Sequence, residues 1–352
     1  MILSPGTVLY KYQLKRCVGK GHFGEVWLAH DLTISRDVAV KVLDASMAPA
    51  ALGLREAQVG NRLNHQNVVK VHYADVCTNH TNNVVLIAMD YHPAGSIMSL
   101  LNPGNFVVMR KAVSAITDVL RGLEYLHNQH IFHNDIKPSN ILIGPQQEAL
   151  LTDYGISCFS PGLLPVPAPN SYSLHIAPET LTTNTISVTT DVYQVGLTLF
   201  RLINGIGLVQ EQKQKVGEVQ FELLKARGKV PAAEDYMPFS GADINRVIRK
   251  ATDPDPSKRF QSAVEMRRAL EKIKYYGYWD CEPTGELFGI YGKYKYTFST
   301  HKSKSGFEMT AYKESDTGRT TRVSKFSSRG LSNTDFLKLK KNYFLAILTG
   351  TI

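Results

Sequence analysis

The sequence predicts an α+β protein in which a small antiparallel sheet comes first, a mostly helical region follows, and a small basic β/α segment ends the chain. Apolar and polar residues alternate up to about Leu43, as in half-buried strands. After Gly95 the apolar spacing becomes helical, and from about Gly277 alternation returns around Tyr294 and Phe298. With 352 residues, the chain is long enough for two or three packing units.

Apolar periodicity and turn residues place the individual elements. The first sheet is expected to have five strands, at 8–14, 26–28, 38–42, 68–73 and 84–89, and one helix at 51–63. Later helices are expected at 107–128, 192–203, 242–252 and 262–275, and four prolines make 160–170 extended. In the tail, strands are expected at 294–298 and 323–326, and Ser332 is the expected cap of a final helix.

Composition narrows the class of protein. Apolar content of 43% and charged content of 20% are typical of a globular chain. The four cysteines are far apart, so we expect no zinc site and no disulfide framework, and a reducing, cytoplasmic location. The N-terminus has no basic leader before an apolar run, and no late apolar run is long enough to span a bilayer, so no membrane anchor is expected. The net charge is +9, and the residues from Gly277 onward, with twelve Lys/Arg and seven Asp/Glu, hold +5 of it.

Five short motifs follow one another along the chain. They are Gly19-x-Gly21-x-x-Gly24-x-Val26, Val38-Ala-Val-Lys41, His133-Asn-Asp135-x-Lys137-x-x-Asn140, Asp153-Tyr-Gly155 and Ala177-Pro-Glu179. Each motif alone is weak, but in this order and at these separations the set resembles the Hanks-type (eukaryotic-like) protein kinases that bacteria also carry. The resemblance covers about residues 7–274.

This resemblance implies a bilobal protein kinase fold and a function. We expect an N-lobe at 7–92, a helical C-lobe at 93–275 and an accessory basic module at 277–352. The implied activity is ATP- and Mg²⁺-dependent phosphoryl transfer to Ser/Thr hydroxyls of protein substrates, with autophosphorylation. Lys137 in the catalytic loop is typical of Ser/Thr-directed members.

The resemblance assigns roles in the chemistry to six polar positions. Asp135 is the expected catalytic base, and Lys137 would neutralise charge on the transferred phosphoryl group. Lys41 would contact the α- and β-phosphates and be positioned by Glu56 on the predicted helix. The oxygen ligands expected to hold Mg²⁺ belong to Asn140 and Asp153.

The nucleotide itself is expected to lie against backbone and apolar side chains. Glycines would let the backbone close over the phosphates, a hinge would meet adenine, and apolar side chains would sandwich the ring. In that order, the expected residues are Gly19, Gly21 and Gly24; Asp90 and His92; and Val26, Ala39 and Leu142.

Supporting residues match the family in most places. Glu179 and Arg259 resemble its buried ion pair, Asp191 its anchor of the catalytic-loop backbone, and His133 is expected to be a packed core histidine. Three positions depart from the pattern. Asn134 replaces an arginine that recruits a phosphorylated activation-loop residue, Gly60 replaces a bulky apolar residue, and Tyr154 replaces phenylalanine.

Two other functions fit part of the pattern. A small-molecule kinase of the aminoglycoside-phosphotransferase type shares the aspartates and the asparagine, but lacks the platform implied by Ala177-Pro-Glu179, Asp191 and Arg259. A pseudokinase scaffold is disfavoured because four residues of the expected chemistry are all present: Lys41, Asp135, Asn140 and Asp153. The tail is interpreted as a regulatory or substrate-docking module. Alternatively, it would bind nucleic acid or an acidic partner through Lys293, Lys295, Lys302, Lys304, Arg319 and Arg322 with interleaved tyrosines.

Overall fold

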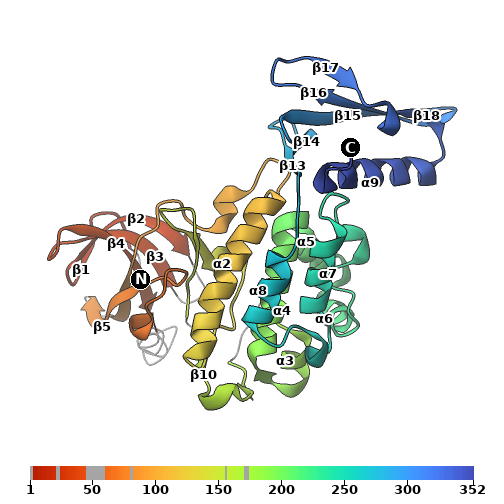
Figure 1. Cartoon of the computed structure of the whole chain (residues 1–352). Coiled ribbons are helices and arrows are strands. Elements are labelled where there is room, and N and C mark those ends of the chain that lie inside the picture. Colours follow the sequence, from red (N-terminus) through yellow and green to blue (C-terminus); the bar gives the residue numbers. More distant parts are fainter. Residues whose placement is uncertain (1–2, 21–23, 45–59, 80–81, 155–156, 170–173) are drawn as a thin grey trace.

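The computed structural model describes residues 3–20, 24–44, 60–79, 82–154, 157–169 and 174–352. Over these residues the chain forms an N-terminal sheet, a helical body and a C-terminal sheet with one long helix against it (Figure 1). The predicted α+β organisation, including the basic β/α segment at the end, is confirmed.

The N-terminal sheet is antiparallel and has six strands in the order β1-β2-β3-β4-β6-β5. The sequence predicted five, because the alternation over 8–14 reads as one strand. Tyr10 has a positive φ of 54°, so the chain turns there and Val8 and Leu9 pair back onto β2. The strands are β1 (Val8–Leu9), β2 (Tyr12–Lys20), β3 (Gly24–Asp31), β4 (Arg36–Asp44), β5 (Val71–Asn79) and β6 (Asn82–Met89).

Alternation along β4 decides which side chains face the helical body. Val38 and Val40 are buried in a separate outer core beneath β2 and β3. Ala39 instead belongs to the main core, which continues into the helical body. Because successive strand residues point to opposite faces, Lys41 lies on the same side as Ala39 and faces the body.

The helical body is built around two long apolar helices. On α2, the predicted apolar stripe that includes Val113, Ile116 and Leu120 is buried, and α4 is buried over most of its length. These helices pack on each other, and α7 and α8 complete the core. The helices are α2 (Met109–Asn128), α3 (Pro178–Thr183), α4 (Val188–Asn204), α5 (Leu208–Val216), α6 (Glu218–Ala226), α7 (Ala242–Ala251) and α8 (Ala263–Glu271).

Short strands and 3-10 turns accompany the helices of the body. Three antiparallel pairs form there: β7 with β10, β8 with β9, and β11 with β12. The strands are β7 (Ile131–Phe132), β8 (Ile141–Ile143), β9 (Ala149–Leu151), β10 (Cys158–Phe159), β11 (Val166–Pro167) and β12 (Thr185–Ile186). The 3-10 turns are η1 (Ile97–Leu100), η2 (Pro138–Asn140), η3 (Pro161–Leu163), η4 (Ala233–Asp235) and η5 (Pro256–Lys258).

The C-terminal segment is a second antiparallel sheet capped by α9 on one face (Figure 1). Ser332 caps α9 as predicted, because its Oγ accepts a hydrogen bond from the Asp335 backbone N–H. The elements are β13 (Tyr278–Cys281), β14 (Leu287–Tyr291), β15 (Tyr294–Ser303), β16 (Gly306–Glu314), β17 (Thr320–Arg322), η6 (Ser324–Phe326), β18 (Ser328–Leu331) and α9 (Asn333–Thr349).

Packing between this segment and the helical body is largely aromatic. Phe344 of α9 lies 4.3 Å from the Trp279 ring and 5.9 Å from the ring of Phe239 in the body, measured between ring centroids. Asn102 of the body also donates a 2.8 Å hydrogen bond to Asp280 of β13. The helix α9 therefore packs against its own sheet and the helical body at once (Figure 1).

Several predicted boundaries are wrong. The strand placed at 68–73 begins at Val71 and continues to Asn79, and Val68 forms only an isolated bridge. The strand placed at 323–326 is a 3-10 turn, in which Phe326 is buried against α9. In the extended 160–170 segment, η3 is a short turn, and α8 ends earlier than the predicted helix at 262–275. Of the helix placed at 51–63, only 60–62 are described and helical.

Candidate active site

A cavity of about 420 Å³ lies between the N-terminal sheet and the helical body. Its lining includes nine residues predicted to hold nucleotide or metal: Gly19, Val26, Ala39, Lys41, Asp90, His92, Asn140, Leu142 and Asp153. Three predicted residues, Gly24, Asp135 and Lys137, do not line it, and Gly21 and Glu56 lie outside the described residues.

Lys41 and Asp153 meet across the cavity. The Lys41 Nζ lies 2.8 Å from Asp153 Oδ1. This ion pair joins β4 to the segment after β9. Burial by itself would raise the pKa of the Asp153 carboxyl, but the charge and hydrogen bond of Lys41 outweigh it and hold that pKa below its ordinary value. Asp153 is therefore an anion near neutral pH, next to a cation.

Three polar side chains of the predicted catalytic loop contact one another in the structure. The Lys137 Nζ lies 2.7 Å from Asp135 Oδ2. Asn140 Nδ2 donates to the same oxygen at 2.8 Å and to the Asp135 backbone carbonyl at 2.9 Å. These contacts fix the Asp135 carboxylate at the edge of the cavity. Asn140 lines the cavity itself and so connects Asp135 to it.

A buried carboxylate holds the loop backbone. Asp191, which is fully buried on α4, accepts hydrogen bonds from the backbone N–H groups of His133 (3.0 Å) and Asn134 (2.7 Å). His127 Nε2 lies 2.9 Å from the same carboxylate. The predicted anchoring role of Asp191 is confirmed by these bonds.

Sequence reasoning missed a second anchor one helical turn further along α4. The Gln194 amide oxygen accepts from the Ile136 N–H at 2.9 Å, and its NH₂ donates to the Asn134 carbonyl at 2.9 Å. Asn134 itself has φ of 62°, so its peptide groups are turned away from regular pairing and need these partners. The spacing of Asp191 and Gln194 on one apolar helix is the signal that would have found it.

The motif around Tyr154 is fixed by its hydroxyl as well as by packing. That hydroxyl donates to the carbonyl oxygens of Leu151 at 2.8 Å and Val69 at 3.3 Å. Gly60 stands where the family has a bulky apolar residue, which predicts a looser coupling of the helix at 51–63 to the active site. In the structure a Cβ at Gly60 would overlap the Val71 side chain and lie 3.4 Å from the Tyr154 ring. Neighbouring side chains therefore occupy the space beside Gly60, and most of that helix lies outside the described residues. His133 is fully buried, as predicted for a core histidine.

Gly24 has a packing role that the motif did not indicate. A Cβ there would overlap the carbonyl oxygen of Val42 on the neighbouring strand, whereas a Cβ at Gly19 would have only Val26 at 3.9 Å nearby. The absence of a side chain at Gly24 therefore permits the close packing of β3 on β4.

This difference predicts the outcome of two alanine substitutions. Gly24→Ala is expected to lower the free energy of unfolding by about 1–3 kcal/mol, because the added methyl group forces the strands apart. Gly19→Ala, the matched control, is expected to change it little. Thermal unfolding of both variants measures the effect, and equal melting temperatures would contradict the assignment.

The hinge after β6 carries contacts that the motifs did not indicate. The Asp90 carboxylate pairs with His72 at 2.6 Å. An Arg16 Nη donates to the Tyr91 hydroxyl at 3.1 Å, so β2 is tied to the hinge across the cavity. Both ring nitrogens of His92 are buried without a hydrogen-bond partner, and burial lowers the pKa of this imidazole, which keeps it neutral.

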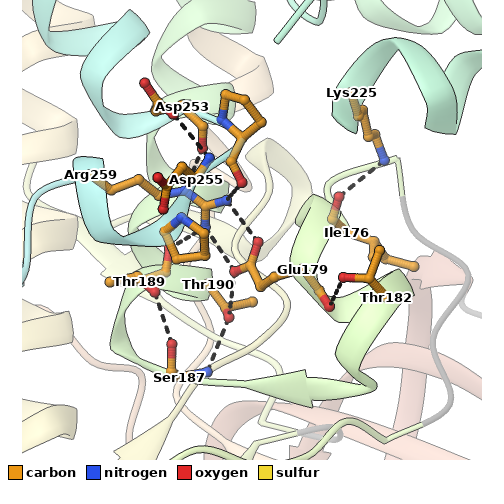
Figure 2. Close-up of polar contacts among 12 residues, drawn as sticks. Ile176, Glu179, Thr182, Ser187, Thr189, Thr190, Lys225, Asp253, Asp255 and Arg259 are labelled. Atoms are coloured by element: carbon orange, nitrogen blue, oxygen red, sulfur yellow. Dashed lines mark hydrogen bonds and ion pairs between the residues drawn. The ribbon is translucent and has the colours of Figure 1, made fainter. Parts of the chain in front are cut away.

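The predicted ion pair between Glu179 and Arg259 is present (Figure 2). The guanidinium is fully buried and lies 2.8 and 2.7 Å from the two carboxylate oxygens. It also donates to the backbone carbonyls of Asp253 at 2.7 Å and Thr189 at 2.9 Å. The pair thus joins α3, the start of α4 and the loop after α7 beneath the activation segment.

A second buried cation lies beside this pair and was missed by sequence reasoning. Lys225 of α6 has no exposed side-chain surface, and its Nζ donates to the Ile176 carbonyl at 3.0 Å (Figure 2). Burial lowers its pKa, and Glu222 at 3.1 Å opposes that effect. Lys225 therefore holds the backbone that leads into Ala177 and α3.

The oxygen donors at the cavity fit a magnesium ion. Asp153 contributes a carboxylate. The Asn140 NH₂ is occupied by Asp135, and the Asn140 amide oxygen, which accepts a 3.3 Å hydrogen bond from the Ser139 hydroxyl, keeps a lone pair for a ligand. Among the described residues no group of three or more His, Cys, Asp or Glu side chains could hold a metal by itself. Two protein oxygens completed by phosphates and water are the usual arrangement for Mg²⁺.

A family model for the protein kinase domain matches residues 12–271. That match covers well over half of the chain and contains every site residue described above. The chain belongs to the protein kinase family. The resemblance read from the motifs and the bilobal kinase fold are thereby confirmed, with the N-terminal sheet as the small lobe and the helical body as the large lobe.

Two curated relatives of the kinase from mycobacteria show the extent of the similarity. The kinase is 32% identical over 286 residues to the serine/threonine-protein kinase PknJ of Mycobacterium tuberculosis, a match that covers 78% of this chain and 47% of the relative. It is 27% identical to the serine/threonine-protein kinase PknB of Mycobacterium leprae over 281 residues, 77% of this chain and 44% of the relative. The matches therefore span less than half the length of these relatives.

Membrane-spanning segments were predicted to be absent. In the part of the chain that the structure describes, no single helix combines the length and apolar character needed to cross a bilayer. Among the described residues, α4 and α5 have the length and apolar character for a span only when taken together, and they meet at a bend of 104°.

Proposed function

We propose that the kinase transfers the γ-phosphoryl group of ATP to serine and threonine hydroxyls of proteins. The observation that carries the proposal is that Lys41, Asp153 and Asn140 line one cavity, and that Asn140 holds Asp135 at its edge through hydrogen bonds of 2.8 and 2.9 Å. The relatives PknJ and PknB are serine/threonine-protein kinases, which supports Ser/Thr specificity, as does Lys137 in the catalytic loop.

In this proposal Asp135 accepts the proton of the substrate hydroxyl and aims that hydroxyl at the phosphorus. Lys137 holds the carboxylate in place now and neutralises charge on the phosphoryl group as it transfers. Lys41 contacts the nucleotide phosphates from β4. The position of its ammonium in the cavity lining, beside Asp153, supports this role.

The remaining walls of the cavity would hold the nucleotide. Val26, Ala39 and Leu142 supply apolar surface, and the Asp90–His92 hinge supplies backbone groups for adenine. Asn140 and Asp153 are the residues that would hold Mg²⁺, which supplies charge neutralisation at the phosphates. Gly24 has a packing role, so Gly19 is the described glycine available to approach the phosphates.

A transfer assay tests the proposal against its alternatives. Radiolabelled ATP with casein, and with the chain alone, is expected to label protein in the presence of Mg²⁺. Label on aminoglycosides but not on protein would favour a small-molecule kinase, and ATP binding without any transfer would favour a pseudokinase. The Glu179–Arg259 platform favours the protein kinase.

Activity is expected to be independent of activation-loop phosphorylation. Asn134 is buried and carries no charge, so it cannot recruit a phosphate as an arginine would. The two serines concerned, Ser171 and Ser173, and Tyr172 between them lie outside the described residues. Alanine at both serines is expected to leave most autokinase activity, measured by incorporation of labelled phosphate. Complete loss of labelling with ATP binding intact would contradict this expectation.

The C-terminal segment, residues 277–352, is proposed to be an accessory module that binds a partner. Its interleaved aromatics do not support the nucleic-acid interpretation, because Tyr296 is buried and Phe298 packs against α9. Lys295 is also paired with Glu282. Base stacking needs exposed rings, so these side chains are not free for it.

All four cysteines are described, and none forms a disulfide. This is the state that a reducing compartment maintains, and it supports the proposed cytoplasmic location.

A further inference from the structure

The accessory sheet has two unlike faces. Phe307, Met309 and Ala311 of β16 point toward α9: Phe307 stacks on Phe336, and the other two are fully buried. Because side chains alternate along a strand, Glu308, Thr310 and Tyr312 point to the opposite face. No described helix packs on that face of β15 and β16 (Figure 1).

A pocket of about 360 Å³ is hollowed into this open face. Two arginines border the pocket. Arg322 lies at the end of β17 and Arg329 lies in β18, and both of these strands pair with β16. Its floor is formed by β15 and β16, which contribute His301, Thr310 and Tyr312. A pocket of this volume is in the range of sites for small ligands or single side chains.

The charge of the pocket is unbalanced. Glu308 is its one carboxylate among the described lining residues, and it is engaged by Arg329 at 2.7 Å. No described residue forms a hydrogen bond or an ion pair with the Arg322 guanidinium. A planar guanidinium beside hydroxyl donors is the arrangement that binds tetrahedral oxyanions through paired N–H···O bonds.

We propose that this pocket binds a phosphorylated serine or threonine side chain of a peptide, with Arg322 as its principal anion ligand. The proposal rests on the proposed function, because the kinase domain in the same chain would generate that group. Because the accessory segment and the kinase domain belong to one chain, a site that binds phosphorylated proteins would raise their local concentration near the catalytic cleft. Phosphopeptide is favoured over nucleic acid because Tyr296 is buried and Phe298 packs against α9, so these two rings are not free to stack on bases.

Fluorescence anisotropy with synthetic peptides tests the pocket without needing catalysis. The full chain carrying Asp135→Asn is titrated into short degenerate peptides centred on phosphothreonine, and into the same peptides without the phosphate. We expect the phosphorylated peptides to bind about tenfold or more tightly than the others. Equal affinities would overturn the proposal, as would binding of a single-stranded oligonucleotide at this site with no phosphopeptide binding.

Arg322→Gln is expected to weaken phosphopeptide binding by about tenfold. The matched control is Arg319→Gln, which removes the same charge from the hairpin turn that precedes β17, outside the pocket lining. Equal weakening by both variants would mean that only net charge matters and would overturn the site. Circular dichroism of both variants establishes that the sheet is folded.

Because the peptides are phosphorylated chemically, the phosphopeptide pocket and the proposed kinase activity can be rejected independently of each other. Loss of phosphopeptide binding with normal transfer to casein would reject the pocket alone. Normal phosphopeptide binding with no transfer by the wild-type chain would reject the proposed kinase activity alone.

Discussion

Asp135→Asn is expected to lower kcat for casein and for autophosphorylation by about 10²–10⁴-fold, because an amide cannot accept the hydroxyl proton. ATP affinity is expected to stay close to that of the wild type, since Asp135 does not line the cavity. The amide oxygen can still accept from Lys137 or Asn140, so the loop is expected to keep its shape. Initial rates with labelled ATP, together with calorimetric titration of ATP and Mg²⁺, separate the two effects.

The control for this variant is Asp243→Asn, which removes a carboxylate that is exposed on α7 and paired only with Arg246 among the described residues. It is expected to leave both kcat and ATP affinity unchanged. A rate for Asp135→Asn close to that of Asp243→Asn would show that another group accepts the proton. Weakened ATP binding in the Asp135 variant alone would instead mean that the carboxylate helps to shape the nucleotide site.

Local patterns predicted the parts of this site that depend on local geometry. Alternation along β4 was sufficient to place Lys41 on the cavity side, because the period of a strand fixes its faces. The motif spacing brought Asp135 and Asn140 into one loop, and hydrogen bonds between them confirm that proximity. The apolar periodicity of α2 likewise predicted its buried stripe.

Contacts between segments distant in sequence were not predictable in the same way. Nothing in the local sequence indicates that Arg16 reaches Tyr91, because such a contact depends on how whole elements pack. The packing role of Gly24 was not indicated for the same reason: its close neighbour is a carbonyl on another strand. In the tail, sequence alternation showed a sheet but could not show which face α9 covers, and that decides which aromatics are exposed.

Arg259→Met is expected to lower the free energy of unfolding by about 3–5 kcal/mol, since it leaves Glu179 buried without its cation. All five N–H donors of this guanidinium have acceptors: two Glu179 oxygens and the backbone carbonyls of Asp253, Thr189 and Pro254 (Figure 2). Removing them also frees α3 and the loop after α7, so transfer to casein is expected to fall with stability. Chemical denaturation and casein assays on the same samples measure both.

Lysine at position 259 tests whether stability depends on the geometry of the guanidinium or only on its charge. Arg259→Lys keeps the cation but has three donors on one nitrogen, so it cannot bridge both Glu179 oxygens and three carbonyls. Its stability is expected to lie between the wild type and Arg259→Met. The surface control is Arg246→Met, whose exposed pair with Asp243 is worth about 0–1 kcal/mol. If Arg259→Met cost no more than that control, the buried pair would not be what holds the platform beneath the activation segment.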